Sequence, residues 1–363
     1  MSNVKIGIVL GPRPEIIRLS SVIKYLEKCN QNFFIIDTGQ HYDYEMNDIF
    51  YKELELKQPK YKLNIGSGTH TEQLSKIILK CGEILSKEKP DIVVVYGDTN
   101  STLGGALASS KMNIPTVHIE AGCRSFDRSA PEEINRICVD HISDVLFPPD
   151  KVAYENLIKE GLDKSRIFLC GSMHIDSCID NIDLAKRKSS ILKDLHLGNE
   201  YAILTIHRAD TTDNKNKLKS LLKILSEIDI PIVFPVHPRT KERIRKFGLE
   251  NLIKNFIVTR PLGYLDFLML MINSKVIFTD SGGVQVEANI LGKPCIVLRD
   301  TTEWKKELDG MSQIAGLKKE NILKAYERID DRKKLDYSKD KDCSKRIIEK
   351  CIELKKEGKL KRS

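Results

Sequence analysis

Residues 276–288 read Val-Ile-Phe-Thr-Asp-Ser-Gly-Gly-Val-Gln-Val-Glu-Ala, which combines a short apolar run, a glycine turn and the start of a helical pattern. The run Val276–Thr279 has no polar alternation, which is typical of a parallel strand covered on both faces. Ser281, Gly282 and Gly283 form the turn, where glycines let the first backbone N–H groups of a helix approach a phosphate. The stretch therefore predicts one strand–turn–helix unit of a parallel α/β protein, with an anion site at the turn.

The same combination recurs along the whole chain. Apolar runs alternate with longer segments of helical period, among them residues 16–29, 71–87 and 216–227. The predicted strands are Val4–Leu10, Phe33–Asp37, Ile92–Tyr96, Thr116–Ile119, Val145–Phe147, Ile167–Cys170, Ala202–Ile206, Ile232–Val236, Phe256–Thr259, Val276–Thr279 and Cys295–Leu298. Strand–helix alternation over 363 residues predicts an α/β fold with two Rossmann-like parallel-sheet domains.

The two series of strands are separated by a seam near residues 171–182. We expect a first domain at residues 1–170 and a second at residues 171–344. A last helical pattern, about residues 345–363, is expected to pack back on the first domain. Loops from both sheets would then face one cleft, which is the expected ligand site.

Composition excludes several classes of protein. With 41% hydrophobic and 30% charged residues, the chain is neither disordered nor collagen-like. Its apolar runs are shorter than the roughly 18 residues of a membrane span, and its start lacks a signal-like segment, so we expect a cytoplasmic protein without a membrane partner. The nine cysteines show no Cys-x-x-Cys spacing and predict reduced thiols.

The net charge of +8 is concentrated at the C-terminal end. Residues 345–363 hold eight lysines and arginines against three glutamates, so most of the excess belongs to one helical face and its tail. Since no basic stripe is interleaved with aromatic residues, we expect no nucleic-acid partner.

Three carboxylates stand where an α/β protein places ligands. Asp98 in Tyr-Gly-Asp-Thr (96–99) and Glu120 in His-Ile-Glu-Ala-Gly (118–122) follow predicted strands, and Glu132 opens a helical pattern after a proline. Asp98 could instead cap a helix, and Glu132 could stand at the helix start merely because the helix dipole favours an acidic residue there. Together, the three predict a general base and a general acid, with burial and repulsion raising at least one pKa.

Cationic and turn residues predict a diphosphate site. Arg13, at the start of a helical pattern, suits bidentate phosphate binding, and His207 beside Arg208 suits a leaving diphosphate, although either type of residue is often structural. Glu287 follows the turn at 281–283 and could accept from ribose hydroxyls. The chain lacks Walker, Gly-x-Gly-x-x-Gly and metal-ligand spacings, so neither a dinucleotide cofactor nor a metal is predicted.

Taken together, the motifs resemble the non-hydrolysing UDP-N-acetylglucosamine 2-epimerases over about residues 4 to 316. The matching motifs are Gly-Pro-Arg-Pro-Glu (11–15), Thr-Gly-Gln-His (38–41), Tyr-Gly-Asp-Thr (96–99), His-Ile-Glu-Ala-Gly (118–122), Pro-Glu-Glu-Ile-Asn-Arg (131–136), His-Arg (207–208), Thr-Asp-Ser-Gly-Gly-Val-Gln (279–285) and Leu-Gly-Lys-Pro (291–294). The resemblance implies two domains of the glycosyltransferase-B or glycogen-phosphorylase type, a homodimer, and neither NAD nor a required metal.

The resemblance also implies a reaction and roles in it. A base removes the C2 proton of UDP-GlcNAc, UDP leaves from C1, and UDP adds back to the 2-acetamidoglucal to give UDP-ManNAc for surface polysaccharide synthesis. The acid and base candidates are Asp98, Glu120 and Glu132, with His207 as a further catalytic residue. The implied substrate-binding residues are Arg13, Arg18, Asp98, Glu120, His207, Arg208, Leu262, Phe267, Ser281, Gly282, Gly283 and Glu287, of which Leu262 and Phe267 flank uracil.

Some positions depart from the usual family pattern. Pro12 replaces threonine, Arg18 replaces lysine, Asp210 replaces glutamate, Val286 replaces glutamate and Trp304 replaces arginine. These departures leave the exact UDP-sugar open, including a diacetamido uronic acid or a 6-deoxy sugar.

Other readings differ in the kind of protein or site. A hydrolysing variant, a glycosyltransferase and a nucleotide-sugar sensor are alternatives, but the last two poorly explain three carboxylates at these positions. For a second, allosteric substrate site the suggestive residues are Gln40, His41, Arg208 and His237.

Overall fold

The computed structural model describes residues 4–39, 50–198, 200–302, 308–337 and 340–360. They belong to two compact units, Met1–Ser177 with Asp340–Ser363, and Cys178–Lys339, which we call the first and the second unit. The chain leaves the first unit within helix α7 (Met173–Asp180) and returns to it ahead of helix α16 (Cys343–Lys356). From the sequence we placed these crossings at 170/171 and 344/345.

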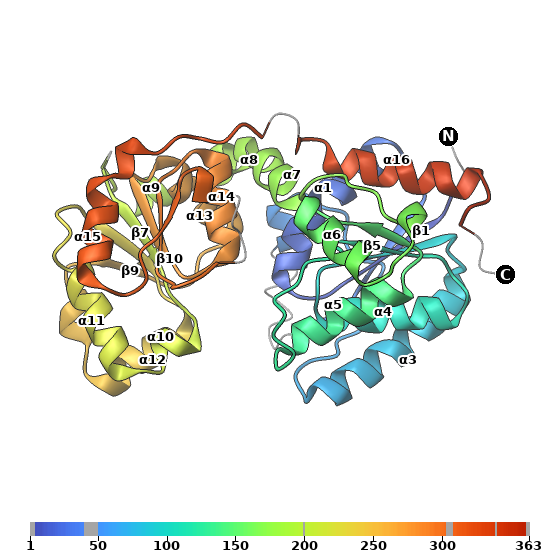
Figure 1. Ribbon diagram of the computed structural model, residues 1–363, viewed down its shortest axis with the longest axis horizontal. Helices are drawn as coiled ribbons and strands as arrows, with labels where there is room; N and C mark the ends of the chain where they lie inside the picture. The colour runs from blue at the N-terminus through green and yellow to red at the C-terminus, as the bar shows by residue number, and fades with distance from the viewer. Residues whose placement is uncertain (1–3, 40–49, 199, 303–307, 338–339, 361–363) are drawn as a thin grey trace. The chain divides into compact units, whose positions relative to one another are not determined.

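The first unit is a six-stranded parallel sheet in the order β3-β2-β1-β4-β5-β6. Its strands are β1 (Ile6–Leu10), β2 (Phe33–Asp37), β3 (Tyr61–Lys62), β4 (Ile92–Tyr96), β5 (Thr116–Ile119) and β6 (Val145–Phe147). Its helices are α1 (Arg13–Lys28), α3 (His70–Glu88), α4 (Asn100–Lys111), α5 (Pro131–Ile142) and α6 (Lys151–Lys159), with α16. Helices α3, α4 and α5 cover one face of the sheet, and α1 and α16 lie together on the other (Figure 1).

The second unit is also a six-stranded parallel sheet, in the order β12-β11-β10-β7-β8-β9. Its strands are β7 (Ala202–Thr205), β8 (Ile232–Pro235), β9 (Ile257–Thr259), β10 (Val276–Thr279), β11 (Cys295–Val297) and β12 (Ser312–Ile314). Its helices are α8 (Ile182–Lys188), α9 (Ile191–Asp194), α10 (Ala209–Thr212), α11 (Lys215–Leu225), α12 (Pro238–Phe247), α13 (Tyr264–Asn273), α14 (Gly282–Leu291) and α15 (Lys319–Glu327). The predicted α/β fold with two parallel sheets is confirmed.

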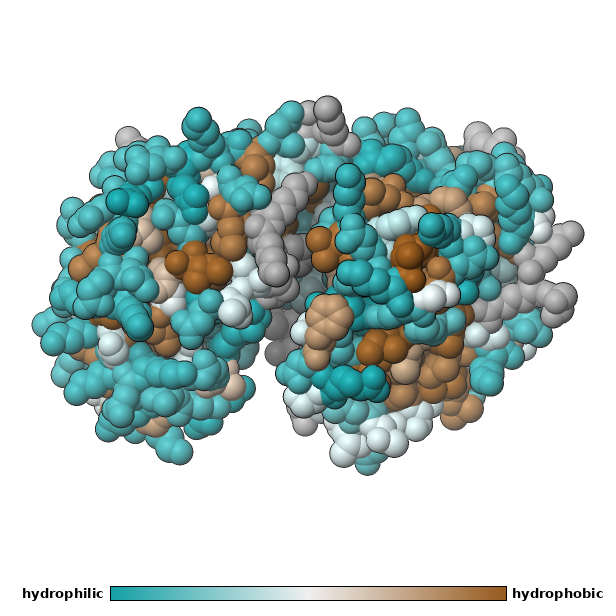
Figure 2. All heavy atoms as spheres, in the orientation of Figure 1, coloured by the Kyte–Doolittle hydropathy of each residue, from teal (hydrophilic) through white to brown (hydrophobic). Residues whose placement is uncertain are grey.

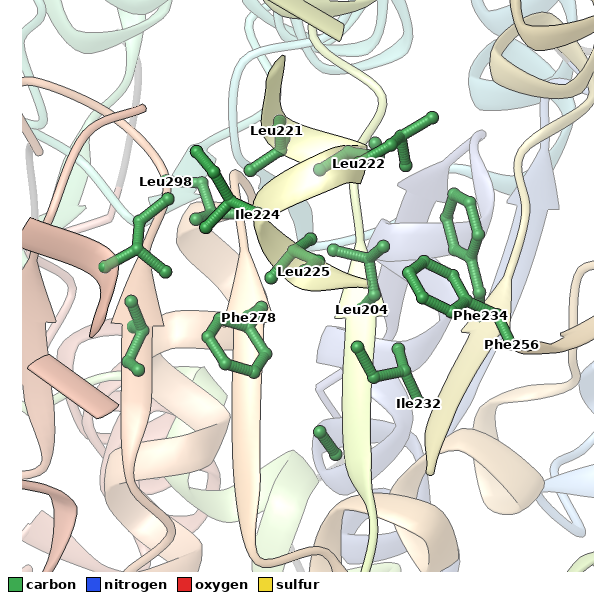
Figure 3. Packing of buried hydrophobic residues seen from close by; sticks show 14 of the residues in the cluster. Leu204, Leu221, Leu222, Ile224, Leu225, Ile232, Phe234, Phe256, Phe278 and Leu298 are labelled. Carbon is green, nitrogen blue, oxygen red and sulfur yellow. The ribbon is translucent and has the colours of Figure 1, made fainter. Parts of the chain in front are cut away.

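Buried apolar side chains join the second sheet to its helices. Leu204, Phe234 and Phe278 project from neighbouring strands toward Leu221 and Leu225 of α11, and all five are fully buried (Figure 3). Because both faces of such strands are covered, their sequences read as continuous apolar runs, which is why most of them could be predicted.

The prediction was wrong at a few elements. Residues 167–170 form no strand, since only Ile167 pairs with the sheet, in an isolated bridge to Leu146. Strands β3 and β12 were not predicted, because they are short edge strands with partly exposed residues. Helix α1 begins at Arg13 rather than at residue 16, because a proline is tolerated in the first turn, where its missing N–H is not needed.

Both sheets reverse their strand order at one point, between β1 and β4 and between β7 and β10. In open α/β sheets, ligands bind outside the carboxyl ends of the strands at such a reversal. The loops that follow these four strands are residues 11–12, 97–99, 206–208 and 280–281. The topology thus gathers the predicted residues of each unit at one edge of its own sheet.

Helix α16 is part of the first unit although it follows the second in sequence. Ile347, Ile348 and Cys351 are buried on its apolar face. Tyr25 of α1 donates to Glu349 Oε1 at 3.0 Å, and Asp176 Oδ2 accepts from the backbone N and the hydroxyl of Ser344 at 2.7 Å each. The basic C-terminal segment therefore has a packed apolar side and a charged outer side.

The surface drawn in Figure 2 is largely hydrophilic on both units. Among the helices of the described ranges, none combines the length and the apolar character that crossing a bilayer requires. Six of the nine cysteines are buried.

Gly122, after β5, should not tolerate a side chain. Its φ is +77°, and an added Cβ would lie 2.2 Å from the carbonyl oxygen of Ala153. We expect Gly122→Ala to lower the free energy of unfolding by about 3 kcal/mol, measured by denaturant titration. Gly82→Ala, in helix α3 with open space around it, is the control and should raise stability by up to about 1 kcal/mol. Equal stability of the two variants would contradict the close contact.

Candidate active site

Asp98 follows strand β4 and is paired with a cation. Arg136 of α5 bonds Asp98 Oδ2, and Asn135 Nδ2 donates to the Asp98 carbonyl at 2.8 Å. Thr99, not Asp98, caps helix α4, because its hydroxyl accepts from the N–H groups of the first turn. The Asp98 side chain stays 25% exposed, so its carboxylate is oriented by Arg136 and still accessible.

Glu120 follows strand β5 in a strained backbone conformation. Its φ is +72°, which is unfavourable for a residue with a Cβ and is found preferentially at functional sites. Tyr96 Oη donates to Glu120 Oε2, and Nε2 of His174 lies 3.8 Å from the same oxygen. Burial raises the pKa of Glu120 and the bond from Tyr96 opposes that rise, so this carboxyl holds a proton more readily than an exposed glutamate does.

Glu132 and Glu133 open helix α5 and differ in their surroundings. Glu133 is only 1% exposed, and it accepts from the N–H groups of Ser125 and Phe126 and from Arg136. Burial by itself would raise the pKa of Glu133, but these bonds outweigh it and lower the pKa. Glu132 is exposed, and within the described ranges no hydrogen bond or ion pair joins it to Asp98 or Glu120.

The structure therefore brings together two of the three predicted carboxylates. Asp98 and Glu120 both lie within the field of Arg136, and the Asp98 charge contributes to the raised pKa of Glu120. Glu132 occupies the exposed start of α5, one position before the glutamate that bonds Arg136.

Glu15 is a site residue that sequence reasoning missed. Its Oε2 accepts from the Gly11 N–H at 2.7 Å, and its Oε1 accepts from the hydroxyls of Thr99 at 2.6 Å and Thr102 at 3.1 Å. Burial raises the pKa of Glu15 to about 8, with Asp98 as a smaller contribution. These bonds tie the loop after β1 to the loop after β4. The sequence contained a signal for Glu15, because an acidic residue in the first turn of a helix can accept hydrogen bonds from the backbone N–H groups that precede it.

The predicted cations of the first unit lie at the start of α1. Arg13 is its first residue, and its guanidinium lies 4.5 Å from the ring centre of Phe50. Arg18, further along α1, donates to Ser177 Oγ at 3.1 Å. Burial, and then the charge of Arg18, lower the pKa of His174 well below its ordinary value. The charge of Arg18 also acts on Glu120, whose pKa it lowers.

A buried ionic cluster supports the strand ends. His118 Nδ1 lies 2.7 Å from Asp140 Oδ1, and its Nε2 lies 2.8 Å from the Gly97 carbonyl. Arg124 and the Gly122 N–H bond the other oxygen of Asp140, at 2.7 and 3.0 Å. Burial would raise the pKa of Asp140, but His118 and Arg124 outweigh it and lower the pKa. The cluster fixes the loops that carry Asp98 and Glu120.

In the second unit, Asp280 organises His207 and Arg208. Its Oδ1 lies 2.9 Å from His207 Nδ1, and its Oδ2 accepts from the backbone N–H groups of His207 and Arg208 at 2.8 and 2.9 Å. Burial would raise the pKa of Asp280, but His207 and these N–H bonds lower it. Asp280 is 1% exposed, whereas the His207 side chain is 48% exposed, so the ring is held at Nδ1 while its other side is accessible. The sequence suggested His207 and Arg208 but not the carboxylate that orients them.

The glycine turn opens helix α14 as predicted. Ser281 is the residue before its first turn, and Gly282 and Gly283 are its first two residues. Free N–H groups at a helix start attract anions. Glu287 is buried in the same helix, and its Oε1 accepts from Tyr264 Oη at 3.1 Å.

The remaining predicted binding residues lie around α13 or outside the described ranges. Phe267 is a partly buried residue of α13, and Leu262 is a partly buried residue of the loop before it. Gln40 and His41 lie outside the described residues. The rings of His207 and His237 have centroids 6.5 Å apart.

Two doubly wound six-stranded parallel sheets define an α/β protein of the glycosyltransferase-B-like fold. A glycosyltransferase from Rickettsia africae shares the fold alone, with a TM-score of 0.57 and 15% identity over 99% of this chain and 98% of that one. The crystal structure of Methanocaldococcus jannaschii UDP-GlcNAc 2-epimerase with UDP-GlcNAc and UDP is much more similar. Its TM-score is 0.84, with 44% identity over 96% of this chain and 99% of that one.

Sequence comparison points to the same family. Residues 24–350 match the family described as UDP-N-acetylglucosamine 2-epimerase. The UDP-N-acetylglucosamine 2-epimerase of M. jannaschii is 47% identical over 89% of this chain and 91% of the relative. The UDP-2,3-diacetamido-2,3-dideoxy-D-glucuronate 2-epimerase of Pseudomonas aeruginosa is 40% identical over 88% and 91%. The chain belongs to the UDP-N-acetylglucosamine 2-epimerase family, which confirms the resemblance drawn from its motifs.

Proposed function

We propose that this chain is a non-hydrolysing epimerase that interconverts UDP-GlcNAc and UDP-ManNAc for polysaccharide synthesis. The observation that carries the proposal is that Asp98 and Glu120 follow the neighbouring strands β4 and β5, where Glu120 combines a strained backbone with a pKa that burial and the Asp98 charge raise. Family membership supplies the substrate class.

In the proposed reaction, a carboxylate removes the proton from C2, the C1–O bond to UDP breaks, and a double bond forms between C1 and C2. A UDP oxygen then adds to C1 while a second carboxyl protonates C2 on the opposite face. We assign these proton transfers to Asp98, Glu120 and Glu132. Glu120 is suited to hold the proton, because burial favours its neutral form.

The second unit would hold the leaving UDP. The N–H groups at 281–283 bind the diphosphate. Arg13 and Arg18 stay predicted substrate-binding residues of the first unit. With Asp280 at Nδ1, His207 acts as an imidazolium, in which both ring nitrogens carry hydrogen, and donates from Nε2 to the departing oxygen. Glu287 binds the ribose, and the residues around α13 flank uracil. The homodimer implied by the resemblance stays a prediction.

A modified UDP-sugar is the second candidate substrate. The 40% identity to an epimerase of a diacetamido glucuronate favours it, because that relative is named for a different sugar on the same nucleotide. The chemistry at C2 would be the same, so only the groups around the rest of the sugar would differ.

The protein incubated with UDP-GlcNAc in D2O should place deuterium at C2 and form UDP-ManNAc without added NAD or metal. Mass spectrometry and proton NMR of the recovered UDP-sugars measure both changes. Parallel incubations with UDP-diacetamido-glucuronate and with a 6-deoxy UDP-sugar identify the preferred substrate. If none of these sugars gains deuterium at C2, the proposed elimination is wrong.

A further inference from the structure

Tyr96 and Glu120 belong to neighbouring strands of the first sheet. Tyr96 is the last residue of β4 and pairs with Ile119 of β5, so the side chain of the next residue, Glu120, comes within reach. The ring of Tyr96 is buried, with 5% exposed, and its hydroxyl donates to Glu120 Oε2. Burial, and then the charge of Glu120, raise the pKa of Tyr96 well above its ordinary value, so the hydroxyl keeps its proton and remains a donor.

Among the residues that the structure describes, five charged or titratable ones surround Glu120 besides Tyr96. One is Cys123, in the loop after β5, whose pKa is raised well above its ordinary value by burial and then by the charge of Glu120. Arg18 of α1 and Arg136 of α5 lower its pKa, whereas Asp98, in the loop after β4, raises it. His174 of α7 is kept neutral by burial and by Arg18, and its Nε2, at 3.8 Å from Oε2, is beyond hydrogen-bond distance. Tyr96 therefore makes the direct bond to this oxygen, while Arg18, Arg136 and Asp98 act through their charge.

We infer that Tyr96 is a positioning residue whose hydroxyl holds Glu120 Oε2, so that Oε1 is the oxygen that exchanges the proton with C2 of the sugar. The inference rests on the acid–base role proposed for Glu120. A carboxyl that turned freely would present either oxygen at a range of angles, and proton transfer needs one fixed geometry. The strained backbone at Glu120 and the bond from Tyr96 together fix both ends of the side chain.

The hydrogen bond from Tyr96 changes the pKa of Glu120 in a predictable direction. A hydroxyl that donates to a carboxylate favours the ionised form, so the bond lowers the pKa of Glu120. Removing it should raise that pKa by about one unit. The affected limb of the pH profile moves to higher pH by the same amount with UDP-GlcNAc and with UDP-ManNAc, because the ratio of the two kcat/KM values is a pH-independent equilibrium constant.

Tyr96→Phe, in the full chain, is the test. We expect kcat to fall about tenfold with KM for UDP-GlcNAc nearly unchanged, and one limb of the kcat/KM profile to move up by about one pH unit. Carbon NMR of protein labelled at the glutamate δ-carbon, with the Glu120 signal assigned by its loss in Glu120→Gln, should show the same upward shift of the titration midpoint. Tyr201→Phe is the matched control, since Tyr201 is also buried and donates to the Leu270 carbonyl at 2.7 Å in the second unit.

Each outcome decides the matter. A shifted limb, a shifted NMR midpoint and a lower kcat, with Tyr201→Phe like the wild type, support the inference. An unshifted midpoint would overturn the bond, and a loss of kcat equal at all pH values, or no loss, would overturn the positioning role. A wild-type protein that leaves every UDP-sugar unchanged overturns the proposed function itself, whereas normal wild-type turnover with an unaltered Tyr96→Phe overturns only this inference.

Discussion

Glu132→Gln should lower the turnover of UDP-GlcNAc about a thousandfold and leave the affinity for UDP within about twofold of the wild-type value. Glutamine has the shape of glutamate but cannot take up or release a proton. Because Glu132 is exposed at the start of α5, its replacement should leave the fold intact. Turnover is measured by separating the two UDP-sugars, and UDP affinity by calorimetry.

Glu133→Gln is the matched control at the adjacent position. It weakens the bonds to Ser125, Phe126 and Arg136 and should cost about 2 kcal/mol of unfolding free energy, visible in denaturant titration. The two variants thus distinguish a loss of turnover, expected for Glu132→Gln, from a loss of stability, expected for Glu133→Gln. A stable, inactive Glu133→Gln beside an active Glu132→Gln would mean that the proton-transferring carboxylate is Glu133.

Asp280→Asn should lower kcat on the order of a hundredfold, with little change in the affinity for UDP. The amide oxygen of asparagine can still accept from the N–H groups of His207 and Arg208. Its amide nitrogen then faces His207 Nδ1, and the ring must accept there. The ring is then neutral with its single hydrogen at Nε2, so the imidazolium that would pass a proton to the departing diphosphate oxygen is no longer supported by a carboxylate.

Nitrogen NMR of the labelled His207 ring reports the tautomer directly. Asp213→Asn is the control, because Asp213 pairs with Arg239 and Arg243 at the surface of the same unit, where the loss of an ion pair has little effect on stability. Full turnover in Asp280→Asn would remove His207 as a donor to the leaving group.

The two sheets could be predicted from the sequence because their inner strands carry uninterrupted apolar runs. Ile92–Tyr96 is buried along its whole length and is recognisable without any other information. The two-residue strand β3 is not, since Tyr61 and Lys62 are partly or fully exposed and their pairing depends on β2.

The candidate site was predictable only where a residue follows a strand in sequence. Asp98, Glu120 and His207 carry that signal. Asp280 also follows a strand, but its role, like the roles of Glu15 and Tyr96, comes from contacts between segments. Glu15 contacts Thr99, 84 residues away, and Asp280 contacts His207, 73 residues away. No local pattern records such a contact.

The placement of α16 in the first unit has a consequence for biosynthesis. Everything the second unit needs lies in one uninterrupted segment, Cys178–Lys339, so that unit can close while the chain is still being made. The first unit cannot, because the helix that packs on α1 leaves the ribosome only after the whole second unit has been synthesised. We therefore expect the unit that is translated first to be completed last, with the side of α1 that contacts α16 accessible to chaperones in the meantime.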